Sequence, residues 1–263
     1  MKIYQQFLTR NSCFATGQQL NPIGVMVHST GANNPRLSRY VPGNAAIGVN
    51  TAGNHWNQTN AEWKQKYGDA LNKCVHAFVG QTVDGQIAVV QTLPWDMRGW
   101  HAGMYAGNNR YIGFEICEDG LADPDYFRVT RDAAVELTAM LCRMFGWDPM
   151  APSVVICHAE GYKLGVASNH ADVLHWWKLF GYDMDMFRRD VATKMREEEE
   201  EMTQEQFDKM MDNWLARQAE KPVSGWAEKL LEEAKSRGIT DGLRPQAFAT
   251  RQEVALMVNA GTK

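Results

Sequence analysis

The chain has 263 residues, and 27 lysines and arginines against 31 aspartates and glutamates give it a formal net charge of −4 at pH 7. Nucleic-acid-binding proteins normally carry an excess of basic residues that displaces counterions from phosphates, so we expect no nucleic acid as a partner. No apolar run approaches the roughly 18 residues of a membrane helix, which argues against membrane insertion, and a hydrophobic content of 44% excludes disorder over most of the length.

Short β-branched runs predict the strands of a central sheet. The runs at 23–27 and 154–157 each follow a proline and stop at a histidine, His28 or His158. The runs at 75–79 and 86–91 flank Asp84-Gly85, which is the strongest short hairpin signal in the chain. A further run at 112–116 carries Glu115 in its middle.

One long helix is predicted after these strands. Thr130 can cap it, and Gly146 stands where helices often stop. The apolar positions between them recur at helical spacing: Ala133, Leu137, Met140, Leu141, Met144 and Phe145. Strands that alternate with helices indicate an α/β domain with a central mixed β-sheet flanked by helices.

The composition changes at Arg196, where a run of glutamates at 197–201 begins. Like charges repel, so this run predicts a solvated boundary. Beyond it, helix caps are predicted at Thr203, Ser224 and Thr250. We therefore expect a catalytic-size domain at 1–195, a charged helical linker at 196–222, and a small helical C-terminal appendage at 223–263.

The histidines that follow the buried strands are the first candidates for chemistry. A catalytic metal site needs three protein ligands and one open position. His28 and His158 supply two, and Asp172 is the third candidate because its polar loop, 168–172, has room to fold back. The alternative is that each histidine is merely packed in the core, since spacing alone does not show that they converge.

Glu115 is unusual because it stands inside an apolar strand. An unpaired buried carboxylate costs several kcal/mol, so it must be paired, protonated or beside a metal. An ion pair with Arg98 or Arg110 is one interpretation. The functional interpretation is a general base whose pKa is raised by burial, or an anchor for a metal-bound water.

The segment 98–103 combines two glycines with aromatic and polar side chains, which suits a loop that lines a substrate site. Arg98, Trp100 and His101, together with Asn109, are therefore the expected substrate-binding residues. The alternative is a tight turn with a packed tryptophan. The chain shows no serine-hydrolase elbow and no nucleotide-binding glycine motif.

The 5 cysteines are scattered and contain no CxxC pair, so they do not indicate a disulfide framework. We expect inert core thiols in a reducing compartment. Residues 1–20 are polar and lack the apolar core of a secretory signal peptide, so synthesis in the cytoplasm without a signal peptide is expected.

Several segments, taken in order, resemble a known family. They are Gly24-Val-Met-Val-His28-Ser-Thr30, Val75-His-Ala-Phe-Val79, Asp84-Gly85, Gln91-Thr-Leu-Pro94, Arg98-Gly-Trp-His-Ala-Gly103, Ile112-Gly-Phe-Glu115 and Val155-Ile-Cys-His158. Together they are similar to the zinc-dependent N-acetylmuramoyl-L-alanine amidases, the type-2 amidases related to peptidoglycan recognition proteins. The likeness spans roughly residues 20–180. The form with Ser168-Asn-His-Ala-Asp172 before Trp176-Trp177 most resembles amidases of clostridial bacteria and their phages.

This resemblance implies zinc as cofactor, held by His28, His158 and Asp172, with Glu115 as the carboxylate that activates water. The family often has a lysine two residues before the last ligand, where it stabilises the oxyanion. Here that position is His170, so His170 and Lys163 are the alternatives for that role.

The resemblance also implies an activity and a partner. The expected reaction is hydrolysis of the amide between N-acetylmuramic acid and L-alanine in peptidoglycan, by a lytic enzyme (endolysin or autolysin) that reaches the wall through a phage holin or lysis. The alternatives are a non-catalytic peptidoglycan-binding module of the same fold and a zinc hydrolase of another amide. The tail at 226–251 resembles a single S-layer-homology repeat, which implies contact with a cell-wall polymer or a homodimer.

Overall fold

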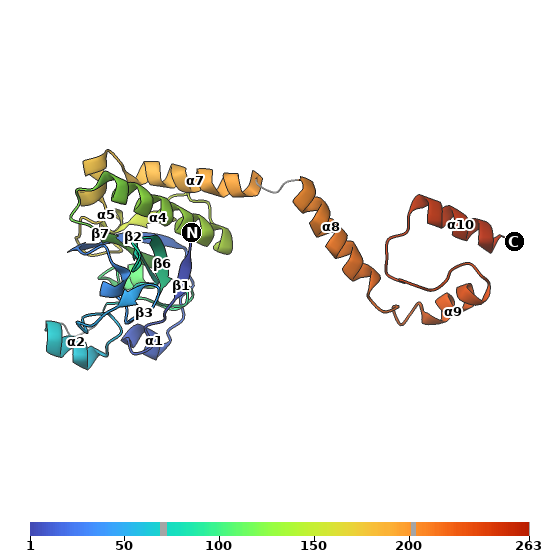
Figure 1. Cartoon of the computed structure of the whole chain (residues 1–263), viewed down its shortest axis with the longest axis horizontal. Helices are drawn as coiled ribbons and strands as arrows, with labels where there is room; N and C mark the ends of the chain where they lie inside the picture. Colours follow the sequence, from blue (N-terminus) through green and yellow to red (C-terminus); the bar gives the residue numbers. More distant parts are fainter. Residues whose placement is uncertain (69–72, 201–203, 263) are drawn as a thin grey trace. The chain divides into compact units, whose positions relative to one another are not determined.

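A computed structural model describes residues 1–68, 73–200 and 204–262 of the chain (Figure 1). The chain divides into two compact units, Met1–Glu197 and Glu198–Lys263. The expected division into a domain at 1–195, a linker at 196–222 and an appendage at 223–263 stays a prediction. Within the described ranges, no helix is both long and apolar enough to cross a membrane.

The first unit is built on a sheet whose described strands follow the order β1-β6-β5-β7-β2-β8. Strands β5 and β6 pair antiparallel, whereas the other neighbouring pairs run parallel. The bounds are Ile3–Gln5 for β1, Gly24–Asn33 for β2, Ala77–Gln81 for β5, Ile87–Gln91 for β6, Tyr111–Glu118 for β7 and Val155–Cys157 for β8. This sheet with its helices confirms the expected mixed α/β fold.

Shorter elements surround this sheet. A second sheet pairs β3 (Gly43–Asn44) with β4 (Gly48–Val49). The helices of the first unit are α1 (Ser12–Thr16), α2 (Asn60–Tyr67), α3 (Tyr105–Asn108), α4 (Pro124–Phe145), α5 (His158–Lys163), α6 (Leu174–Trp177) and α7 (Met184–Glu200), with 3₁₀ turns at Leu37–Arg39 and Lys178–Phe180.

Side chains alternate across the strands, so each strand contributes to both faces of the sheet. One face buries Val25, Val27, Ile112 and Phe114 against α4, α6 and α7 in the larger core cluster. The opposite face carries Met26, His28 and Glu115, whose positions have the other parity. The same face also buries a second hydrophobic cluster that includes Phe78, Val90 and Cys117, so both faces stabilise the fold and only this one carries the polar residues of the site.

Two predicted element boundaries were wrong. Helix α4 begins at Pro124, because the Asp123 side chain caps it by accepting from the amides of Asp125 and Tyr126. Thr130 is buried inside the helix, where its hydroxyl donates to the Tyr126 carbonyl at 2.8 Å, a bond that needs no helix end. Strand β2 does not stop at His28 but continues to Asn33, since pairing with β7 extends the ladder.

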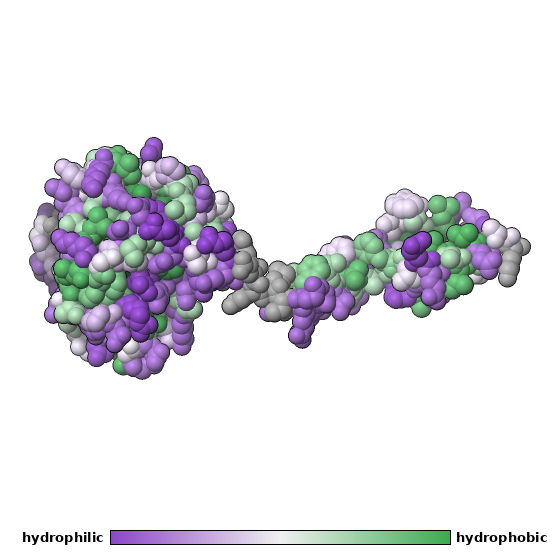
Figure 2. Space-filling model, turned by 90° about the horizontal axis from the view of Figure 1, so that it is seen from above, coloured by the Kyte–Doolittle hydropathy of each residue, from purple (hydrophilic) through white to green (hydrophobic). Residues whose placement is uncertain are grey.

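The second unit contains α8 (Gln204–Ala219), α9 (Glu228–Ser236) and α10 (Arg251–Gly261). The predicted cap at Thr250 is confirmed as a capping box with Glu253. Helix α9 starts at Glu228 rather than just after Ser224, and the cap predicted at Thr203 lies outside the described residues. No residue of 204–262 is buried, and Figure 2 shows hydrophobic side chains on the surface of this unit.

One buried ion pair joins α7 to the sheet edge that bears His158. The Arg188 guanidinium donates to both carboxylate oxygens of Glu160 at 3.0 Å and to the Val155 carbonyl at 2.8 Å. Glu160 in turn accepts from the Cys157 amide at the start of α5. A two-pronged arginine–carboxylate contact of this kind is among the stronger polar interactions.

We expect Arg188→Ala to lower the free energy of unfolding by about 2 kcal/mol, because it leaves a partly buried carboxylate and a carbonyl without their donor. Urea denaturation of the full chain measures this loss. Arg189→Ala, at the exposed neighbouring position, is the matched control and should stay within about 0.5 kcal/mol. Equal effects of the two substitutions would contradict the role of the Arg188 contact.

Candidate metal centre and catalytic cavity

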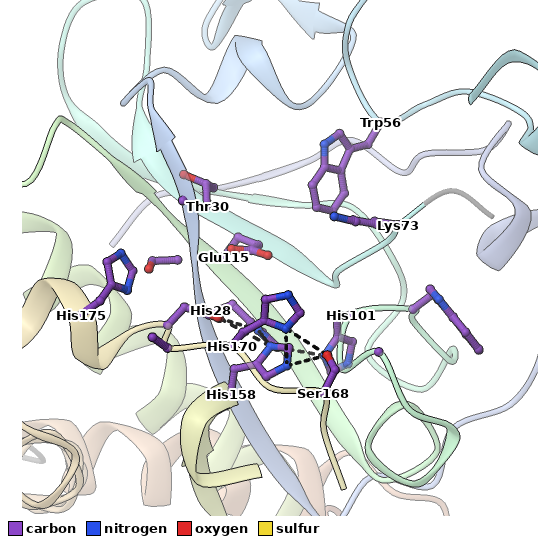
Figure 3. A pocket seen from close by; sticks show the side chains of 16 residues that line it. His28, Thr30, Trp56, Lys73, His101, Glu115, His158, Ser168, His170 and His175 are labelled. Carbon is purple, nitrogen blue, oxygen red and sulfur yellow. Dashed lines mark hydrogen bonds and ion pairs between the residues drawn. The ribbon is translucent and has the colours of Figure 1, made fainter. Parts of the chain in front are cut away.

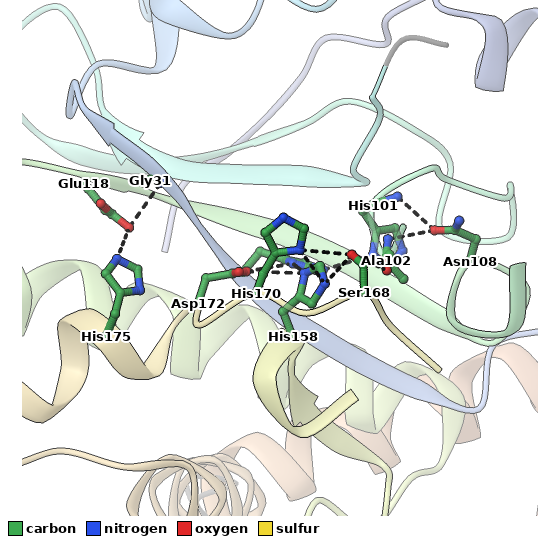
Figure 4. A network of polar contacts seen from close by, with 11 residues as sticks. Gly31, His101, Ala102, Asn108, Glu118, His158, Ser168, His170, Asp172 and His175 are labelled. Carbon is green, nitrogen blue, oxygen red and sulfur yellow. Dashed lines mark hydrogen bonds and ion pairs between the residues drawn. The ribbon is translucent and has the colours of Figure 1, made fainter. Parts of the chain in front are cut away.

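Three potential metal ligands converge on the face of the sheet opposite α4. The ligand atoms of His28, His158 and Asp172 all lie within 4.8 Å of one another. His28 Nδ1 is 3.0 Å from Asp172 Oδ2 and 3.1 Å from His158 Nδ1, and His158 Nδ1 is 3.6 Å from the same carboxylate oxygen (Figure 4). Both histidines are buried, and Asp172 is half-buried.

The parallel pairing of β2 with β8 explains why the two histidines meet. Val27 stands beside Cys157 in the register, so His28 and His158, the next residues, lie side by side as β8 ends and α5 begins. The loop after α5 then returns to the same place, where the Asp172 carbonyl accepts from the Ala159 amide at 3.2 Å. Backbone hydrogen bonds thus hold the third ligand beside the first two.

The donor set suits a metal ion. A tetrahedral ion with bonds of about 2.0–2.1 Å separates its ligand atoms by about 3.3–3.4 Å. The observed separations of 3.0, 3.1 and 3.6 Å bracket that value. Two imidazoles and one carboxylate leave a fourth position free, which is the composition of a catalytic rather than a structural site.

The electrostatics of the cluster favour the ligand forms of His158 and Asp172. Burial lowers the pKa of His28, but the hydrogen bond and charge of Asp172 outweigh burial, so the net shift of His28 is upward. Burial, with the nearby charge of His28 as the next cause, lowers the pKa of His158 to about 4, so its ring is neutral at pH 7. Burial raises the pKa of Asp172, but the hydrogen bond and charge of His28 outweigh it, and the net shift is downward. A neutral imidazole and an ionised carboxylate are the species that bind metals.

Glu115 stands next to the metal ligands. It pairs with His28 in the register of β7 and β2, so both side chains lie on the same face of neighbouring strands. Burial raises its pKa to about 7, and the Asp172 charge adds to that effect whereas the charge of His28 opposes it. Its Oε2 atom is buried without a hydrogen-bond partner among the described residues.

The ion pairs that sequence analysis offered for Glu115 are absent. Among the described residues, neither Arg98 nor Arg110 forms a salt bridge with Glu115. An acid held at the cluster with a raised pKa and an unoccupied oxygen has the properties of a general base.

The ligands and Glu115 open onto a cavity of about 520 Å³ (Figure 3). The ring of His170 points into it, and His170 Nδ1 is 3.0 Å from Ser168 Oγ. The other residues that line it include Thr30, Gly31, Trp56, Lys73, Trp100, His101, Gly103, Ser168, Ala171 and His175.

The expected substrate-binding residues divide into two groups. Trp100 and His101 line the cavity, whereas Arg98 and Asn109 are not among its lining residues. Arg98 instead donates to the Asn109 side chain at 3.4 Å, and its guanidinium lies over the Trp100 ring. Arg98 therefore contacts the lining residue Trp100, and Asn109 contacts Arg98.

Lys163, the alternative to His170 as oxyanion donor, lies elsewhere. It lines a separate cavity of about 380 Å³ together with Ser153, Glu160 and Arg188. His170 thus remains the expected donor that reaches the metal cluster. This outcome could not be read from spacing, because both residues fall in the same stretch between the ligands.

Sequence reasoning missed several residues of the cavity. Trp56 and Lys73 reach it from segments that carry no motif, and Lys73 contributes a positive charge that lowers the pKa of Glu115. His175 also lines the cavity, where its ring pairs with the buried Glu118 carboxylate at 3.1 Å. Its place just before the two core tryptophans suggested packing alone.

Comparison with known proteins agrees with this geometry. The N-acetylmuramoyl-L-alanine amidase family matches residues 18–173. Among solved structures, the hydrolase AmiA of Staphylococcus aureus, crystallised with its ligand, has a TM-score of 0.52 and 21% identity, and the match covers 74% of this chain and 83% of that one. PlyL has a TM-score of 0.48 and 18% identity over 73% and 97% of the two chains. No curated protein sequence matches.

The AmiA likeness concerns the fold, whereas the family match spans more than half of the sequence and contains His28, Glu115, His158, His170 and Asp172. The arrangement of these residues around one cavity is what hydrolysis of an amide would require. The chain belongs to the N-acetylmuramoyl-L-alanine amidase family.

Proposed function

We propose that the chain is a zinc-dependent enzyme that hydrolyses the amide between N-acetylmuramic acid and L-alanine in peptidoglycan. The observation that carries this proposal is the complete set of three converging ligands beside an unpaired buried glutamate. A non-catalytic binding module needs neither the full ligand set nor a carboxylate held without a partner. The family match supplies the substrate class.

Zinc suits this donor set better than other common ions. Imidazole nitrogen is a preferred ligand of zinc, whereas calcium and magnesium select oxygen. When bound, zinc lowers the pKa of a coordinated water toward about 7 and polarises the scissile carbonyl.

The protein residues then divide the proton transfers. Glu115, in its ionised form, takes the proton of the attacking water and later gives it to the leaving amine of L-alanine. His170 donates a hydrogen bond to the tetrahedral oxyanion, a contact typically worth about 3 kcal/mol. Trp56 and Trp100 supply apolar cavity walls for the substrate.

The biological setting is part of the same proposal. We infer a cell-wall lytic role of the clostridial or phage type, with synthesis in the cytoplasm and release by a holin or lysis. The unit 204–262 would serve as an S-layer-homology-like accessory that contacts a wall polymer or a second copy of the chain. Its exposed Trp214, Trp226 and Phe248 side chains support such a contact.

Replacement of Glu115 by glutamine should lower kcat by about 10²- to 10⁴-fold, since the variant keeps the shape of the side chain but cannot accept the proton. Zinc content should remain that of the wild type, because Glu115 is not a ligand. Glu136→Gln, on α4 at the other face of the sheet, is the control. Activity of Glu115→Gln at half the wild-type level or more would exclude its role as base.

Replacement of His28 by alanine should abolish stoichiometric zinc binding, because two remaining ligands hold the ion poorly. Metal analysis of the purified protein after dialysis measures this. His55→Ala, in a different cavity, is the matched control and should keep its zinc. Full zinc occupancy in His28→Ala would refute the ligand assignment.

The reaction itself is tested by end-group analysis of purified bacterial cell walls digested with and without a zinc chelator. Without the chelator, we expect new free amino ends of L-alanine and no new reducing sugar. With the chelator, we expect no new amino ends to form. Sedimentation of the protein with the walls without any new ends would instead favour the binding module.

A further inference from the structure

A second layer of side chains lies behind the three ligands. It consists of His101, Ser168 and Asn108, and His101 comes from the segment 98–103 that sequence analysis expected to contact substrate (Figure 4). Each ligand histidine uses one ring nitrogen toward the cluster. The second nitrogen of each ring makes a separate contact in this layer.

The chain of contacts from His28 through His101 to the Tyr111 carbonyl shows which atom donates in each hydrogen bond. His28 Nε2 is 3.0 Å from His101 Nδ1, and His101 Nε2 is 3.1 Å from the Tyr111 carbonyl oxygen. A carbonyl only accepts, so His101 Nε2 carries the hydrogen and its Nδ1 accepts from His28 Nε2. A neutral His28 with its hydrogen on Nε2 has its lone pair on Nδ1, the atom that faces Asp172 and His158.

His158 is oriented in the same way. Its Nε2 is 3.2 Å from Ser168 Oγ, and that hydroxyl donates to the Ala102 carbonyl at 3.3 Å. A hydrogen on His158 Nε2 leaves the lone pair on Nδ1, again the atom that faces the cluster. Both ligand histidines are thus connected to the two consecutive residues His101 and Ala102.

The backbone of this pair of residues is itself held from behind. Asn108 is fully buried, and its Oδ1 accepts from the His101 and Ala102 amides at 2.8 Å each. Two glycines leave room for the layer. A Cβ at Gly113 would lie 2.4 Å from His101 Nδ1, and a Cβ at Gly103 would lie 2.3 Å from Ser168 Oγ.

We propose that His101 and Ser168 are positioning residues of the metal centre: they set the tautomer and ring orientation of His28 and His158, and His101 offers no ring nitrogen to substrate. Both ring nitrogens of His101 are already engaged within the protein, which leaves it no donor or acceptor for a ligand. The inference rests on the proposed metal function. Hydrogen bonds to ligand histidines of this kind typically change metal affinity by about 10- to 100-fold.

The test is zinc affinity of the purified full chain, measured by competition with a chromophoric chelator. We expect His101→Ala to bind zinc about 10- to 100-fold more weakly than the wild type. His101→Asn should recover part of that loss, because its amide oxygen can still accept from His28. His55→Ala, which removes an imidazole from a different cavity, should bind as the wild type does.

A second readout is the visible absorption spectrum of the cobalt-substituted protein. Because this spectrum reports ligand geometry, we expect it to change in His101→Ala and in Ser168→Ala but not in His55→Ala. Zinc affinity of His101→Ala within twofold of the wild type would overturn the proposal. If His101→Ala does not fold, two other variants test the proposal: His101→Asn and Ser168→Ala, the second at a half-exposed loop position. Wild-type zinc affinity and a wild-type cobalt spectrum in both variants would overturn the proposal.

These outcomes separate the inference from the proposed function. A wild-type chain that binds zinc but releases no L-alanine ends would contradict the amidase activity, while the affinity ratios would still decide the role of His101. A wild-type chain that binds no zinc would overturn both.

Discussion

The pairing of β2 with β7 on one side and β8 on the other is the constraint on which the site depends. The pairing of β2 with β7 places His28 beside Glu115. The pairing of β2 with β8 places Val27 beside Cys157, so that His158, the next residue, lies next to His28. A shift of one residue in either register would turn the side chains to the opposite face. That face is filled by the apolar core against α4, so hydrophobic burial along β2 also fixes the direction of its polar residues.

The cluster also shows how buried polar groups satisfy one another. Asp172 balances the imidazoles, and the second nitrogens of His28 and His158 reach His101 and Ser168. Beside these ligands, Glu115 Oε2 is buried without a hydrogen-bond partner among the described residues, as are Ser29 Oγ on the same strand as His28 and Asn108 Nδ2 behind His101. Of these groups only Glu115 is a titratable acid next to the metal ligands, and a carboxylate in that setting is where a reactive group is expected.

Much of this could be predicted from the chain itself, but not all of it. The Asp84-Gly85 hairpin and the Thr250 cap depend on neighbouring residues, and both are present in the structure. The sequence predicted the start of α4 at Thr130, which is too late. A threonine hydroxyl can cap a helix, but it can also donate to the carbonyl one turn earlier inside the helix, as Thr130 does to Tyr126. Local pattern does not distinguish those two uses of a hydroxyl. The helical character of 204–262, with none of its residues buried, likewise agrees with its sparse apolar stripes.

The sequence by itself determined the type of fold, the ordered motifs of the family and the residue types available for chemistry, since these depend on periodicity and on contacts between near neighbours. Only the tertiary structure decided which residues meet. It brought Trp56 and Lys73 into the cavity, placed Lys163 at a different cavity, and set the His101 ring against His28. These outcomes depend on strand register and loop return over separations of many residues, and the free energy that selects them comes from burial of the whole sheet.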